Sequence, residues 1–226
     1  MGDSHARHWL PAFDIVASRL GLNVTARPMA SCPPSVTPVK FWTRETGTRA
    51  FVECVDWVRQ GVDLALKERP AAVVFAACAK VYTPAVQNSS ATVVAEGVVQ
   101  AARRIIAADI PVLFIKSTPM MPVNIPDCLA MEAKRSPGAI VAPSCSVTKQ
   151  KGLAKESPAD TAGNLYPIMK RLAFDDVFCV DGTCPPVIGN VVVYQDTHHL
   201  TRPFSQSLAN ALERRLLEAA RLLGTH

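Results

Sequence analysis

The 226-residue chain has no apolar run of the roughly 18 residues that a membrane-spanning helix requires. Its N-terminus lacks the basic and apolar regions of a signal peptide, and internal repeats and low-complexity segments are absent. Lys and Arg are scattered rather than gathered into a block, which argues against a nucleic-acid partner although the net charge is +5. With 49% hydrophobic residues, the chain can bury a full core, and we expect a single domain over residues 1–226.

The seven cysteines include no Cys-x-x-Cys pair, so zinc ribbons and thioredoxin-like sites have little support. Cys179 and Cys184 flank an Asp-Gly dipeptide, a favoured hairpin turn, and this favours a local disulfide. Two further bridges and one thiol outside them are also predicted: Cys32–Cys54, Cys128–Cys145 and Cys78. Three bridges would indicate an oxidising, extracytoplasmic compartment. The alternative is a cytosolic core with several buried, reduced thiols.

Hydrophobic periodicity predicts alternating helices and short buried strands. Helices are expected from soon after Ser4 to Gly21, and over residues 51–62, 94–108, 160–172 and 208–223. Strands are expected over residues 22–27, 71–77, 112–115, 177–180 and 191–194, with a long proline-rich region between 118 and 174. This order is typical of a three-layer α/β/α sandwich with a mostly parallel, flavodoxin-like sheet.

One element of that architecture is missing from the sequence. In a doubly wound sheet a central first strand leads into the first helix, but here only Met1, Gly2 and Asp3 precede Ser4. We therefore expect an N-terminal truncation and a sheet that lacks its first strand. The two neighbouring strands would then have unpaired backbone groups, and the chain would be poorly stable.

Four of the five histidines lie in two clusters at opposite ends of the chain. These are His5 and His8, beside Ser4, and His198 and His199, beside Asp196. A strand-to-helix turn would place Ser4 at the carboxyl edge of the sheet and at a helix N-terminus, whose dipole favours negative charge. Asp196 and His199 fall on a loop before the last helix, from which they can reach that edge. The two ends together can supply a nucleophile, a base and an orienting carboxylate.

In these residues the sequence resembles the SGNH (GDSL-like) hydrolase family, which has a Gly-Asp-Ser block near the start and an Asp-x-x-His block near the end. Further motifs resemble, over nearly the whole chain, the SGNH domains fused to membrane-bound acyltransferase family 3 proteins. They are Trp9-Leu10-Pro11, Ser31-Cys32-Pro33, Cys54 with Trp57, Cys179 to Cys184, and Tyr194 to Thr201. Those proteins O-acylate cell-envelope sugars, with the SGNH domain outside the membrane.

The resemblance implies an activity and its participants. It implies an O-acyltransferase or esterase that handles an acetyl-like group, with an acyl donor and a carbohydrate acceptor as partners. It also implies a possible acyltransferase family 3 membrane domain as partner, an extracytoplasmic location in the cell envelope, and no cofactor.

By the same resemblance, Ser4 would attack the acyl carbonyl, His199 would move the proton, and Asp196 would orient His199. Where the family has a Gly-x-Asn-Asp block, this chain has Cys78-Ala79-Lys80, and the family's second-block glycine is also absent. The backbone amides of Ser4 and Ser31 are therefore the expected oxyanion donors. Two further residues are candidate substrate contacts, namely His5 and His198. The alternative is that His5 only packs against or caps the first helix turn and that His198 is an exposed neighbour.

Two other classes of function remain open at this stage. One is a metal-dependent hydrolase, whose zinc or manganese ligands would be His5, His8, Asp196, His198 and His199. The other is a glycan-binding module that kept the fold and has weak turnover. The missing asparagine favours this second class. A chelator distinguishes the metal enzyme from a serine esterase.

Overall fold

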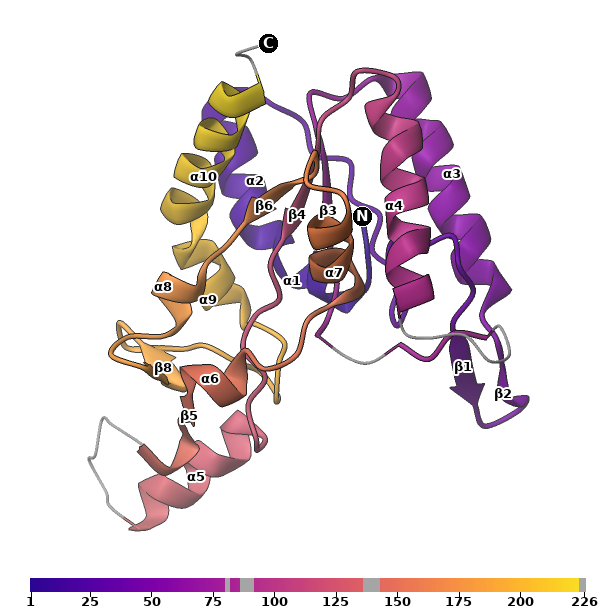
Figure 1. Cartoon of the computed structure of the whole chain (residues 1–226). Helices are drawn as coiled ribbons and strands as arrows, with labels where there is room; N and C mark the ends of the chain where they lie inside the picture. Colours follow the sequence, from indigo (N-terminus) through magenta and orange to yellow (C-terminus); the bar gives the residue numbers. More distant parts are fainter. Residues whose placement is uncertain (80–81, 86–91, 136–142, 224–226) are drawn as a thin grey trace.

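The computed structural model describes residues 1–79, 82–85, 92–135 and 143–223 (Figure 1). Its centre is a parallel sheet with the strand order β3 (Val73–Ala76), β4 (Val112–Ile115) and β6 (Lys170–Leu172). Successive side chains of β4 point to opposite faces, so that Phe114 packs into one core cluster and Ile115 into the other.

Two layers of helices cover these faces (Figure 1). One layer contains α2 (Leu10–Leu20), α9 (Arg202–Ser207) and α10 (Ala209–Leu223), and the other contains α3 (Val52–Glu68), α4 (Thr92–Ile106) and α7 (Pro158–Leu165). The predicted three-layer α/β/α sandwich with a parallel sheet is thus confirmed. None of the helices in the described residues is both long and apolar enough to cross a membrane.

The helix predicted after Ser4 is two consecutive helices, α1 (Ser4–His8) and α2. Asp3 caps α1, because its side chain accepts a hydrogen bond from the backbone N–H of His5 at 2.7 Å. Gly21 ends α2 in the left-handed conformation (φ 64°), as its position in the sequence predicts.

The last strand of the sheet differs from the prediction. We expected a helix to residue 172 and a strand over 177–180, but α7 ends at Leu165 and β6 follows it. Pro167 explains the early end, since a residue before proline disfavours the helical conformation. Residues 175–178 form α8 (Asp175–Phe178), whose two acidic residues in the first turn suit a helix N-terminus. The predicted strand over 177–180 is therefore wrong.

The strand predicted over 191–194 exists in part but lies outside the central sheet. Its first residues form β9 (Val191–Val192), which pairs antiparallel with β8 (Val187–Ile188). The turn between them is Gly189-Asn190, with positive φ at both residues.

Several elements were not predicted. One is the hairpin of β1 (Lys40–Thr43) and β2 (Gly47–Ala50). Four lie in the proline-rich region: α5 (Ile125–Arg135), the 3₁₀ turn Pro143–Cys145, β5 (Val147–Thr148) and α6 (Lys149–Gly152). The last is β7 (Thr183–Cys184), near the end of the chain. β5 and β7 pair antiparallel.

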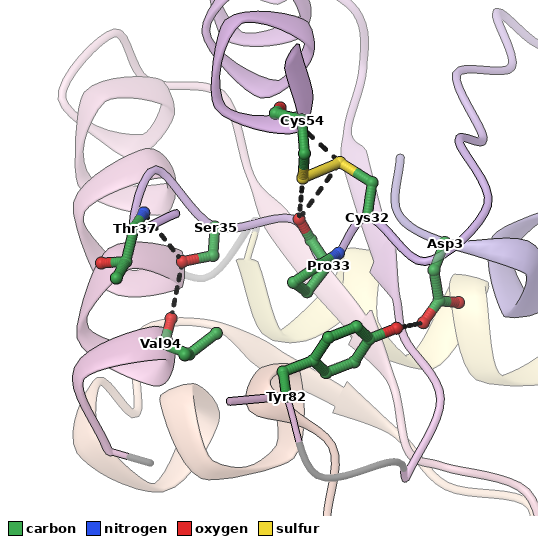
Figure 2. The surroundings of a disulfide bond; sticks show 8 residues. All are labelled: Asp3, Cys32, Pro33, Ser35, Thr37, Cys54, Tyr82 and Val94. Atoms are coloured by element: carbon green, nitrogen blue, oxygen red, sulfur yellow. Dashed lines mark hydrogen bonds between the residues drawn. A yellow bond between two sulfur atoms is a disulfide. The ribbon is translucent and has the colours of Figure 1, made fainter. Parts of the chain in front are cut away.

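The three predicted disulfides are present: Cys32–Cys54, Cys128–Cys145 and Cys179–Cys184. Cys78 lies outside them as a buried thiol, as predicted. Asp181 and Gly182 both have positive φ and form the turn inside the smallest loop. The bridge between Cys32 and Cys54 fastens the loop that follows Pro28 to helix α3 (Figure 2).

The start of the chain lies beside β3, at the edge of the central sheet. Gly2 makes isolated parallel bridges to Ala76 of β3 and to Pro28. Among the described residues, the first regular element is α1, and Met1 and Gly2 lie between β3 and Pro28. The strand predicted over residues 22–27 is absent, because these residues form no ladder with a neighbouring strand.

Candidate active site

The two ends of the chain meet at Ser4. His199 Nε2 lies 2.7 Å from Ser4 Oγ, and His199 Nδ1 lies 2.6 Å from Asp196 Oδ2. Ser4 is the first residue of α1, and the two partners come from the loop between β9 and α9. The hydroxyl, imidazole and carboxylate that the sequence predicts to cooperate therefore form one continuous hydrogen-bonded chain.

The Asp196 carboxylate is fixed by its own loop. Its Oδ1 accepts hydrogen bonds from the backbone N–H groups of His198 and His199, each at 2.8 Å. Partial burial favours a higher pKa, but these bonds and the His199 ring lower the pKa of Asp196 to about 2. An ionised Asp196 can only accept, so His199 Nδ1 is the donor and His199 Nε2 is left to accept the Ser4 proton.

A second carboxylate, Asp3, fixes the turn that carries Ser4. Asp3 is 1% exposed and accepts hydrogen bonds from the Cys78 backbone N–H at 2.7 Å and from the Tyr82 hydroxyl (Figure 2). Burial raises the pKa of Asp3, and these hydrogen bonds oppose the rise. The carboxylate thereby ties the Ser4 turn to the loop after β3, where the resemblance expects the Asn block. Sequence reasoning missed Tyr82.

The two expected oxyanion donors are the backbone amides of Ser4, on the first turn of α1, and of Ser31, in the loop after Pro28. The Ser4 amide is at the N-terminus of α1, and Ser31 follows the segment whose Met29 N–H donates to the Gly2 carbonyl. Within the described residues, neither the Ser4 nor the Ser31 amide donates a hydrogen bond to the protein. Ser31 has φ 59°, a conformation that favours glycine, which agrees with the family's glycine in this loop. Their role as donors stays a prediction.

Three further histidines, His5, His8 and His198, pack around His199. His5 is 2% exposed, and its Nε2 lies 3.0 Å from His198 Nδ1. His8 Nδ1 accepts from the Leu200 N–H at 3.3 Å. Burial, with the neighbouring imidazoles, lowers the pKa of both His5 and His8 well below the usual value. Of the two predicted substrate contacts, only His198 has appreciable exposed surface.

Two groups of side chains in the described residues lie close enough together to hold a metal ion. They are His5/Cys78/His198 and Asp196/His198/His199, with ligand atoms within 4.8 Å of one another. His8, a possible ligand from its place in the sequence, belongs to neither group. Nitrogen, sulfur and carboxylate donors suit zinc. An ion in the second group, however, would use the same Asp196 and His199 that now form the chain to Ser4.

Tyr82→Phe tests whether the Asp3 contact supports the nucleophile. The substitution removes one hydrogen bond to a carboxylate, worth about 1.5–3 kcal/mol, while Asp3 keeps its backbone donors. We expect kcat for an aryl acetate to fall about 10-fold or more, with KM nearly unchanged. Tyr166→Phe, which removes a hydroxyl from a ring that stacks with Arg103, is the matched control. If Tyr82→Phe lowers the melting temperature but keeps the wild-type kcat, the hydrogen bond between Asp3 and Tyr82 has only a structural role.

The fold and the family together indicate a three-layer α/β protein of the esterase or acyltransferase kind. The chain matches the family "SGNH domain (fused to AT3 domains)" over residues 1–214, and it belongs to that family. Among solved structures it is similar to the periplasmic domain of a lipopolysaccharide acetyltransferase from Salmonella ser. Paratyphi A. The TM-score is 0.66 at 14% sequence identity, covering 96% of this chain and 81% of that chain. A search of curated proteins found no match.

Proposed function

We propose that this domain transfers or hydrolyses an acetyl-like group in ester linkage to a cell-envelope carbohydrate, with Ser4 as nucleophile. The observation that carries the proposal is the hydrogen-bonded chain from Ser4 Oγ through His199 to Asp196. A hydroxyl bonded to an imidazole that a carboxylate orients is the arrangement of an activated serine.

The chemistry takes two steps of the same kind. Ser4 Oγ attacks the acyl carbonyl carbon and gives its proton to His199 Nε2, while the Ser4 and Ser31 amides donate to the oxyanion. The intermediate collapses, His199 protonates the departing group, and an acyl ester remains on Ser4. A sugar hydroxyl, or water, then passes its proton to His199 and attacks the ester carbonyl. The bond between the acyl carbon and Ser4 Oγ breaks, His199 returns the proton to Ser4 Oγ, and the acylated sugar or the acid leaves.

The comparisons support a substrate class and a location. The family is described as an SGNH domain fused to AT3 domains, and the similar structure is a periplasmic domain of a lipopolysaccharide acetyltransferase. Three disulfides fit an oxidising compartment. We therefore propose an extracytoplasmic location, and a membrane-bound acyltransferase domain as the partner that supplies the acyl group.

A chelator separates this mechanism from metal-dependent hydrolysis. We expect the rate of aryl acetate hydrolysis to be unchanged after dialysis against EDTA, because every step above uses only the chain's own groups. Ser4→Ala, measured beside the wild type, gives the background. Activity that EDTA removes and zinc or manganese restores would instead assign the reaction to the Asp196/His198/His199 group.

A further inference from the structure

A group of metal-binding side chains lies beside the hydrogen-bonded chain at Ser4 and shares no residue with it. The group consists of His5 on α1, Cys78 in the loop after β3, and His198 in the loop between β9 and α9. The ligand atoms of these side chains all lie within 4.8 Å of one another. Three segments that are far apart in the sequence thus bring two imidazoles and a thiol together, and we call these three residues the thiol site.

The two imidazoles have a spacing close to that of zinc ligands. His5 Nε2 lies 3.0 Å from His198 Nδ1, a distance at which the two nitrogens share one hydrogen. In a tetrahedral site with Zn–N bonds of about 2.0–2.1 Å, two nitrogens bound to the same ion are about 3.3–3.4 Å apart. An ion in place of the shared hydrogen therefore requires only a small separation of the rings.

Cys78 supplies the sulfur ligand. Its thiol lies outside the three disulfides and is 5% exposed. A Zn–S bond is about 2.3 Å long, so that a sulfur and a nitrogen bound to the same ion are about 3.6 Å apart. Since the ligand atoms of the thiol site lie within 4.8 Å of one another, the sulfur has to approach by about 1 Å at most.

Two carboxylates hold the three ligand residues by their backbones. Asp3 accepts a hydrogen bond from the His5 N–H through one oxygen and from the Cys78 N–H through the other, each at 2.7 Å. Asp196 accepts a hydrogen bond from the His198 N–H at 2.8 Å. The ligand residues are therefore held in place before an ion arrives, and less conformational entropy is lost when it binds.

The thiol site is buried on one side and reaches solvent on the other. His5 is 2% exposed and Cys78 is as buried, whereas His198 is partly exposed. An ion can therefore enter past His198. Three protein ligands leave the fourth position of a tetrahedral zinc ion to a water molecule.

The other group with metal-binding spacing, Asp196/His198/His199, is the weaker candidate. Asp196 Oδ2 lies 2.6 Å from His199 Nδ1, and His199 Nε2 lies 2.7 Å from Ser4 Oγ. An ion bound to His199 has to replace one of these hydrogen bonds. An ion in the thiol site leaves both in place, and it gains a sulfur ligand, which zinc binds well.

We propose that His5, Cys78 and His198 bind one zinc ion, which fastens α1 and the loop after β3 to the loop that carries His199. On binding, the Cys78 thiol gives its proton to solvent, and the hydrogen between the two imidazoles leaves its shared position. Because the ion joins three segments of the folded chain, its binding stabilises the folded state. No step of the reaction proposed for Ser4 uses this ion.

Cobalt is the probe that reports the sulfur ligand. Protein without an affinity tag is dialysed against EDTA under nitrogen, freed of EDTA, and titrated with Co²⁺ and then with Zn²⁺. We expect one equivalent of Co²⁺ to produce a thiolate-to-cobalt charge-transfer band in the near ultraviolet, with the visible bands of tetrahedral cobalt. Zn²⁺ should remove these bands as it displaces cobalt, and it should raise the melting temperature by several degrees.

Three variants identify the ligands. Cys78→Ser keeps the backbone bond to Asp3 but removes the sulfur, and it should lose both the charge-transfer band and the rise in melting temperature. Asp196→Asn keeps an oxygen for the His198 N–H but removes the carboxylate of the other group, and it should retain both signals. His198→Ala, at a partly exposed position, should lose the rise in melting temperature even if Cys78→Ser lowers the stability of the fold.

A wild-type spectrum that Co²⁺ leaves without a charge-transfer band would overturn the proposal. So would Zn²⁺ binding that is lost in Asp196→Asn and kept in Cys78→Ser, because that result assigns the ion to the other group. The same titrations in Ser4→Ala should match those of the wild type. None of these readouts measures turnover, so their outcome and the outcome for the proposed function are independent.

Discussion

Ser4→Ala should lower the rate of aryl acetate hydrolysis by about 10⁴-fold or more while the melting temperature stays close to that of the wild type. The substitution removes the hydroxyl that we propose as the nucleophile, and it leaves the Asp3 cap and helix α1 in place. Ser18→Ala, at an exposed position on α2, is the matched control and should keep full activity. The measurement is kcat/KM with thermal unfolding of the same samples.

The same experiment includes a test of cooperation. If Ser4 and His199 act as one unit, the double variant with Ser4→Ala and His199→Ala should be no slower than Ser4→Ala alone. Substantial activity in Ser4→Ala, or a double variant much slower than either single one, would mean that Ser4 is not the group His199 serves.

Gly2→Ala should cause the largest loss of stability among single substitutions in the Ser4 turn. A Cβ at Gly2 would stand 1.8 Å from the Ala76 carbonyl oxygen, and the backbone has φ 147°. Because the obstacle is backbone of β3, the turn or the strand must move. We expect a loss on the order of 3 kcal/mol or more in the free energy of unfolding, measured in urea.

Gly21→Ala separates the contact from the conformation. Gly21 also has positive φ (64°), but no atom lies within 4 Å of a Cβ added there. Its substitution should cost only about 1 kcal/mol, the price of a left-handed alanine. Equal losses for the two variants would show that close approach to Ala76 does not constrain Gly2.

The elements that periodicity predicted well are those that bury one face or both. β4 is a short run of four buried apolar residues, and α10 repeats leucine and alanine along one face. β6 could not be predicted in this way, because two of its three residues are charged, Lys170 and Arg171, and only Leu172 is a buried apolar residue. Backbone pairing with β4 makes β6 a strand, and that depends on the tertiary structure.

The candidate site shows the same division. The Ser4 block and the Asp196/His199 block are short linear motifs, so a sequence can display them. The contact of Asp3 with Tyr82 joins residues 79 positions apart, and no spacing rule connects them. The contact of His5 with His198 spans 193 positions. Such contacts depend on which loops meet at the sheet edge.

The most direct measurement is the mass of the protein during turnover. The wild type is mixed with an activated aryl acetate, quenched in acid, and digested for peptide mapping. Our account predicts one added acetyl group, located on Ser4, which is lost on addition of a sugar acceptor or on longer incubation before the quench. It predicts no added acetyl group in Ser4→Ala. Steady turnover with no acetyl group on any peptide, or an acetyl group on another residue that persists in Ser4→Ala, would contradict it.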